Sequence, residues 1–230
     1  MVKIVFTPDW FLNNDVLINL VSFFVLGLFF LFAIKSYTLN KKKSILYLGI
    51  GFLLVAIGEL ATVATKLVLY YDTEITKEIG RVIVTNSIVK SVDIFYYTGF
   101  FFNRLFSLIG FYIIYKIPSR KIFSGDFFLA LVLIFIISTL ANEWFYIYHI
   151  TALALLILII NNYYQTYKNE KITNTKILIS AFIILAISQI LFLMSSINYM
   201  YVTAQSVQLV SYITLFFLVI KIIQNGKKKN

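Results

Sequence analysis

Long runs of apolar residues follow one another along most of this chain. The clearest of them cover residues 16–34, 45–71, 177–197 and 202–220. At about 1.5 Å of rise per helical residue, each run is long enough to cross a hydrocarbon layer of about 30 Å. The runs lack the alternation of a membrane β-barrel strand, and an open sheet would leave its backbone groups unsatisfied in lipid. The pattern therefore predicts an all-α, polytopic membrane protein.

Clusters of basic residues lie between these runs and predict how each helix is oriented in the membrane. They form four clusters, which are Lys35 with Lys41–Lys43, Lys116 with Arg120 and Lys121, Lys168 with Lys171 and Lys176, and Lys221 with Lys227–Lys229. Short cytoplasmic loops are enriched in lysine and arginine, so we place all four clusters in the cytoplasm. Each intervening segment must then cross the membrane twice. Three such hairpins and the first helix predict a bundle of seven transmembrane helices, with the N-terminus outside and the C-terminus cytoplasmic.

The seven spans form one transmembrane domain over residues 1–230. We expect them at about residues 15–35, 45–70, 92–115, 124–142, 145–167, 177–197 and 199–222. Acidic residues and tryptophans agree with this topology, because they fall on the predicted outer side: Asp9, Trp10, Asp15, Asp72, Glu74, Glu78, Asp93, Glu143 and Trp144. The external loop at about 71–91 is expected either to lie on the membrane surface or cap the bundle, or to form a strand pair or an irregular loop.

Composition and charge narrow the function classes. The chain is 60% hydrophobic and 13% charged, outside the range of a soluble domain. Its net charge of +10 is explained by orientation and by anionic lipid headgroups beside the basic loops, so we expect a bilayer and no nucleic acid as partner. With no cysteine and one histidine, thiolate and histidine-rich metal sites are excluded. The chain carries no P-loop and no nucleophile–base motif, so we expect no enzyme activity, metal or cofactor.

Three charged residues inside the predicted spans are the strongest candidates for a site. A charge at mid-membrane costs about 2.5–3.5 kcal/mol, so it needs a partner or a function. Glu59 in the second span and Arg104 in the third lie at similar heights and could meet, while Lys66 shares a helix face with Glu59. They are expected to form either a substrate, ion or proton site or a switch, or else a buried ion pair that ties the two helices. Lys66 is an alternative partner for Glu59, or a side chain that snorkels to the interface.

Further polar side chains gather in the outer halves of the spans. Together they predict an outer pocket with aromatic walls and a few hydrogen-bonding groups, as small-molecule sites have, or else ordinary hydrogen bonding between helices. Its candidate residues are Tyr96, Tyr97, Asn142, His149, Gln205 and Gln208. Glycines in the second and third spans, among them Gly51, Gly58 and Gly110, are expected to allow close helix packing.

The last predicted hairpin carries a family resemblance. Its residues Ile187–Phe192, Tyr199, Ala204 and Gln208–Tyr212 resemble a pattern in small, uncharacterised archaeal seven-helix membrane proteins, which are themselves similar to the membrane portions of sensor kinases. The resemblance implies a sensor-like role. Together with the charged residues and the predicted outer pocket, it leads us to expect a receptor-like or sensor-like protein of the cell membrane with a small-molecule ligand and a membrane or cytoplasmic protein partner. A carrier or channel for an ion or small solute, and an accessory subunit of a membrane complex, are the alternatives.

Overall fold

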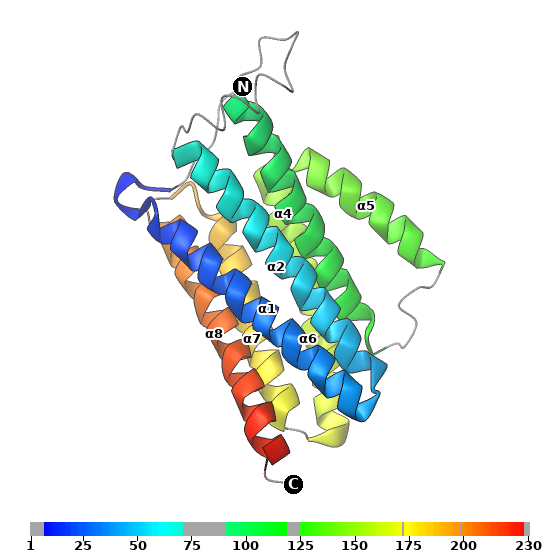
Figure 1. The fold of residues 1–230 in the computed structure, drawn as a ribbon. Coiled ribbons are helices and arrows are strands. Elements are labelled where there is room, and N and C mark those ends of the chain that lie inside the picture. The colour runs from blue at the N-terminus through cyan, green and yellow to red at the C-terminus, as the bar shows by residue number, and fades with distance from the viewer. Residues whose placement is uncertain (1–6, 71–90, 119–124, 172, 198, 228–230) are drawn as a thin grey trace.

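The chain folds into a bundle of long helices. The computed structural model describes residues 7–70, 91–118, 125–171, 173–197 and 199–227 (Figure 1). Over these residues it has a short 3-10 helix η1 (Asp9–Phe11) and seven α-helices: α1 (Asn14–Asn40), α2 (Lys43–Tyr70), α4 (Ser91–Lys116), α5 (Asp126–Leu140), α6 (Phe145–Glu170), α7 (Thr173–Leu193) and α8 (Met200–Lys227). The predicted all-α class is confirmed for the part of the chain described. Most of the predicted external loop lies outside the described residues.

Six of the described helices are long and apolar enough to cross a membrane, namely α1, α2, α4, α6, α7 and α8. The chain therefore has the make-up of a multi-pass membrane protein. The fourth predicted span, 124–142, corresponds to the shorter helix α5, whose 15 residues extend about 22 Å.

Several helices continue past the point where their apolar run ends. The span predicted at 15–35 continues as α1 through Lys35 to Asn40, and the span predicted at 199–222 continues as α8 through Lys221 to Lys227. Lysine is a good helix former, so charge ends the apolar run without ending the helix. The chain instead leaves α1 at Lys41, whose backbone is left-handed (φ 52°) and whose N–H donates to the carbonyl of Tyr37.

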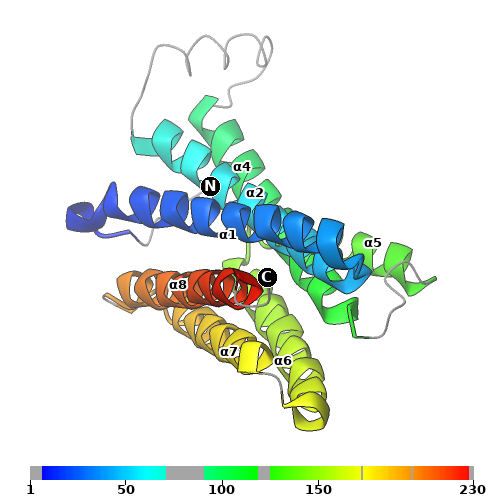
Figure 2. The same cartoon turned by 60° about the horizontal axis from the view of Figure 1, so that its bottom comes forward.

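The six long helices form a closed ring of contacts in the order α1, α2, α4, α6, α7, α8. Helices α1, α2 and α4 pack in succession, as do α6, α7 and α8. These two groups meet where α1 packs on α8 and where α4 packs on α6 (Figures 1 and 2). Helix α5 lies outside the ring, mainly against α4. The ring can therefore enclose a site that belongs to both groups.

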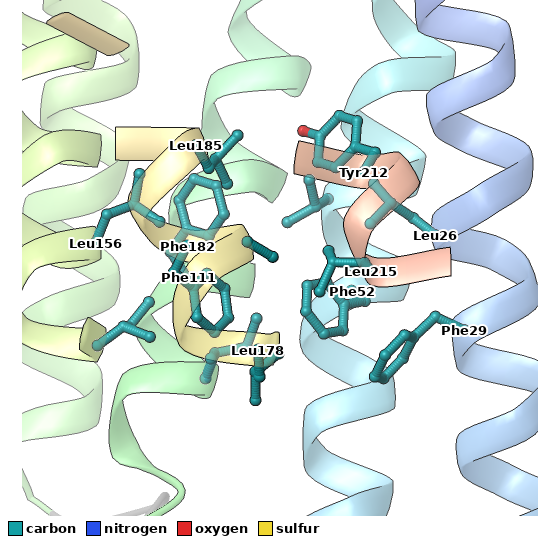
Figure 3. Packing of buried hydrophobic residues seen from close by; sticks show 14 of the residues in the cluster. Leu26, Phe29, Phe52, Phe111, Leu156, Leu178, Phe182, Leu185, Tyr212 and Leu215 are labelled. Carbon is teal, nitrogen blue, oxygen red and sulfur yellow. The ribbon is translucent and has the colours of Figure 1, made fainter. Parts of the chain in front are cut away.

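An apolar cluster fills part of the interior of the ring (Figure 3). The ring of Phe52 on α2 lies between Phe29 on α1 (centroids 4.5 Å apart) and Phe182 on α7 (6.1 Å). Leu215 on α8 is fully buried in the same cluster. Tyr212, one turn before Leu215, stands at the edge of the cluster with its hydroxyl group directed away from Leu215. It marks the boundary between the apolar interior and a polar one.

Helices α2 and α4 approach closely at their glycines, as predicted. A Cβ atom on Gly110 would lie 2.5 Å from the carbonyl oxygen of Gly51, and one on Gly58 would lie 2.9 Å from the carbonyl oxygen of Asn103. The Asn103 amide also donates to the Gly58 carbonyl at 2.9 Å. Only residues without a side chain permit this spacing. It fixes α2 against α4 beside two of the candidate charged residues.

Candidate ligand-binding pocket

A cavity of about 530 Å³ opens within the helix ring, beyond the apolar cluster. Its wall includes residues from all six ring helices, with Asn19 from α1 and Gln189 from α7 completing the circle. All nine residues that the sequence singled out line it: Glu59, Lys66, Tyr96, Tyr97, Arg104, Asn142, His149, Gln205 and Gln208. The intramembrane charges and the predicted outer pocket therefore belong to a single site.

A buried ion pair closes one side of this pocket. The Lys66 ammonium on α2 lies 3.0 Å from the carboxylate of Asp15 on α1, and the two side chains are 4% and 0% exposed. Lys66 also donates to the Asn19 side-chain oxygen at 3.3 Å and to the Tyr201 hydroxyl at 3.2 Å. The Tyr70 hydroxyl donates to the same Asp15 oxygen at 2.7 Å. Lys66 thus uses its three N–H groups on the protein and joins α1, α2 and α8.

Glu59 is held by neutral hydrogen-bond donors. Asn19 donates to its Oε2 at 2.9 Å, while Gln208 at 2.7 Å and the Tyr212 hydroxyl at 3.0 Å donate to its Oε1. Within the described ranges no cation lies within ion-pair distance of Glu59. Such donors stabilise a carboxylate without a countercharge. Glu59 therefore connects α1, α2 and α8, with Asn19 bridging it to Lys66.

The expected ion pair between Glu59 and Arg104 is not formed. Arg104 donates from Nη1 to the side-chain oxygen of Asn142 at 2.6 Å, and its guanidinium carbon lies 5.9 Å from the centre of the Phe100 ring. The alternative pairing of Glu59 with Lys66 is also wrong, because Lys66 pairs with Asp15. Helices α2 and α4 are joined instead by the bond from Asn103 to Gly58. The three charged residues line the same cavity with different partners.

The histidine joins α6 to α7. The Nδ1 atom of His149 lies 2.8 Å from the side-chain oxygen of Gln189, and its ring stacks on Phe192 with centroids 4.9 Å apart. The bond with Gln189 places a proton on Nδ1, because an amide oxygen can only accept. His149 is thus part of the pocket wall and has an amide partner, rather than being an isolated side chain at the interface.

Aromatic rings form much of the remaining wall. Tyr96 and Tyr97 on α4 pack edge to face at 5.3 Å, and Gln205 on α8 donates to the hydroxyl of Tyr201 at 3.1 Å. The aromatic residues that line the cavity are Tyr70, Tyr96, Tyr97, Phe100, Phe111, Phe145, Tyr148, Phe192, Tyr201 and Tyr212. Apolar walls with a few fixed polar groups are typical of small-molecule sites.

Two polar residues of α1 that belong to the network, Asp15 and Asn19, were not among the predicted site residues. Asp15 was expected at the outer interface, where an acidic residue at a helix start needs no buried partner. It lies at that end of α1 but is fully buried. Asn19 stands alone in an apolar run. Asp15, Asn19 and Ser22 recur at intervals of four and three residues, so they share a helix face, and all three are buried. That spacing is the signal that could have identified both.

The chemistry of the pocket follows from these side chains. In the part of the chain that the structure describes, no group of three or more histidine, aspartate or glutamate residues could hold a metal ion. The pocket instead offers a guanidinium, a shielded carboxylate, amides, phenols and aromatic faces. These groups suit recognition of a small organic molecule. No family model matches the chain, and neither a curated protein nor a solved structure was found to match it.

Proposed function

We propose that this protein is a receptor-like or sensor-like seven-span protein of the cell membrane that binds a small molecule in its outer half. The observation that carries the proposal is the aromatic-walled cavity of about 530 Å³, a size within the usual range for small-molecule sites. Its lining comes from both helix groups of the ring. A ligand there would contact both groups and bias their relative position.

The helix directions support seven crossings. Helices α4 and α6 run the same way, and α5 returns the chain between them (Figure 1). Lys41, Lys116, Lys171 and Lys221 lie at the end of the bundle where α1, α4, α6 and α8 finish. Their positive charges support a cytoplasmic position for that end. The pocket lies toward the opposite end, where α6 and α8 begin, and would face outward.

Signal transfer in this proposal depends on a partner. A ligand that moves α6–α8 relative to α1–α4 would change the contacts of α1 with α8 and of α4 with α6. Those helices reach the proposed cytoplasmic end, where a membrane or cytoplasmic protein could respond to the change. A two-state arrangement of this kind is what a receptor requires.

A ligand screen tests the proposal. Purified protein in lipid nanodiscs should gain thermal stability with at least one compound of a broad metabolite and lipid collection, because a ligand that binds the folded state raises its stability. Gln205→Phe should remove the gain, since Gln205 is buried in the pocket wall. The adjacent Ser206→Phe is the matched control, because Ser206 is exposed on the same helix.

Three results would contradict a receptor. A screen without any stabilising compound, together with no co-purifying cytoplasmic partner, would argue against ligand sensing. Gradient-driven flux in liposomes that is lost in Glu59→Gln would indicate a carrier or channel. Stable co-purification with a larger membrane complex would indicate an accessory subunit.

A further inference from the structure

The charged side chains around the pocket differ in how many hydrogen-bond or ion-pair partners they have. Asp15 and Lys66 form an ion pair, and Glu59 accepts hydrogen bonds from three donors. Arg104 is different. In the described part of the chain it has a single hydrogen bond, to the neutral amide oxygen of Asn142, and no carboxylate within ion-pair distance. Among the residues that the structure describes, Arg104 is thus a pocket cation without an anionic partner.

Arg104 lines the cavity, and most of its N–H groups make no hydrogen bond to a described residue. A guanidinium carries five N–H groups in a planar fork, which matches the two oxygens of a carboxylate or a phosphate. One of them is used on Asn142, and the Phe100 ring lies beside the guanidinium. A charge in such an apolar setting is stabilised strongly by an opposite charge, because the local dielectric constant is low. The geometry therefore suits an incoming oxyanion.

The other charges limit the anion to a single negative charge. Lys66 is committed to Asp15, so it does not supply a second cation. Glu59 and Glu143 line the same cavity, and their carboxylates would repel a second negative charge on the ligand. A phosphate monoester or a dicarboxylate is therefore disfavoured. Phe100 lies beside the guanidinium, and Phe145 and Tyr148 line the same cavity. These aromatic side chains favour an apolar or aromatic body on the same molecule.

We propose that the pocket binds a small organic monoanion, with its oxyanion on the Arg104 guanidinium and its apolar body against the aromatic wall. The inference rests on the proposed receptor function and names its ligand class. The same chemistry belongs to soluble carboxylic acids and to the phosphodiester headgroup of a lipid such as phosphatidylglycerol.

Matched acids and amides test the proposal directly. In detergent micelles without added lipid, phenylacetate and octanoate should bind wild-type protein at least about 10-fold more tightly than phenylacetamide and octanamide, measured by calorimetry, because hydrogen bonds to charged groups are the stronger ones. Arg104→Gln should abolish this preference, and Arg104→Lys should retain only part of it, since lysine keeps the charge without the fork. Lys168→Gln is the control, because it removes one positive charge from an exposed residue outside the pocket lining, and it should keep the preference for the acids.

Retention of a lipid during purification would show that the oxyanion comes from a lipid headgroup. Phosphatidylglycerol that survives exchange into detergent on wild-type protein, but not on Arg104→Gln, would support the same site with a lipid headgroup as ligand. The melting temperature of each variant without ligand shows that it is folded. Should Arg104→Gln fail to fold, Arg104→Lys with the acid and amide pairs gives the same comparison.

Three results would overturn the proposal. One is equal binding of acids and amides. Another is unchanged acid binding in a folded Arg104→Gln. The third is wild-type protein that takes up neither the acids nor phosphatidylglycerol. A neutral or cationic compound that stabilises wild-type protein in the broad screen would leave the receptor function standing while removing this ligand class. A screen in which no compound stabilises the protein would contradict both the receptor function and the proposed ligand class.

Discussion

Replacing Lys66 with methionine should lower the free energy of unfolding by about 3–5 kcal/mol, because it leaves the buried carboxylate of Asp15 without its ion-pair partner. Methionine keeps the length of the side chain but cannot pair with the carboxylate of Asp15, which is 3.0 Å from the ammonium in the wild type. The Oδ1 atom of Asp15 has no hydrogen-bond partner among the described residues. The Tyr70 hydroxyl would remain as a donor to Oδ2. Unfolding by a denaturing detergent in mixed micelles measures the loss.

The double variant Asp15→Asn/Lys66→Met separates the charge from the packing. Removing both charges should recover most of the lost stability, since the cost lies in the unpaired carboxylate. Lys168→Met is the matched control, because Lys168 is exposed near the end of α6, and it should leave stability nearly unchanged. A single variant as stable as the wild type, or a double variant no better than the single one, would show that the pair is not coupled as described.

Glu59→Leu should destabilise the protein by about 2–4 kcal/mol, since each buried donor left without an acceptor costs about 1–3 kcal/mol and some donors can pair again. Asn19, Gln208 and Tyr212 all donate to the Glu59 carboxylate, from α1 and α8. Gln208 and Tyr212 keep a bond to each other at 3.1 Å. Detergent-induced unfolding again measures the change, and hydrogen exchange at α8 should increase.

Glu59→Gln is the informative companion to this variant. Glutamine keeps one acceptor oxygen and the volume of the side chain. The free energy of unfolding of Glu59→Gln should therefore lie between those of the wild type and Glu59→Leu. Glu143→Leu is the matched control, because it makes the same replacement at an exposed acidic residue and should change stability little. Wild-type stability in both Glu59 variants would mean that the three donors find equivalent acceptors elsewhere, and that Glu59 does not join α1 and α8.

The fold class and the composition of the pocket could be predicted because each depends on position along a helix. Runs of about twenty apolar residues predict membrane-spanning helices whatever their neighbours are. Glu59, Arg104 and Gln208 lie at related depths in their spans, so a bundle of antiparallel helices brings them to one level. The structure places all three on one cavity. The depth of a residue in the membrane follows from its position along the helix, which can be counted from the sequence.

The pairing of these residues could not be predicted in the same way. Which charges meet depends on the rotation of each helix and on which helices are neighbours. Because α1 packs beside both α2 and α8, Asp15 reaches Lys66 and Asn19 reaches Glu59. That leaves Arg104 on α4 to bond with Asn142. The sequence does not show which helices are neighbours in the ring. The prediction therefore paired Glu59 with Arg104, which lie on helices that are consecutive among the predicted spans.

Native mass spectrometry of protein released from mild detergent tests the central claim most directly. The claim is that the cavity within the ring is a ligand site centred on Arg104. We expect wild-type protein to retain a small organic molecule, and Arg104→Met to lose it while remaining folded. Wild-type protein without any retained molecule other than bulk lipid, or the same adduct on both proteins, would contradict the claim and leave the polar groups a purely structural role.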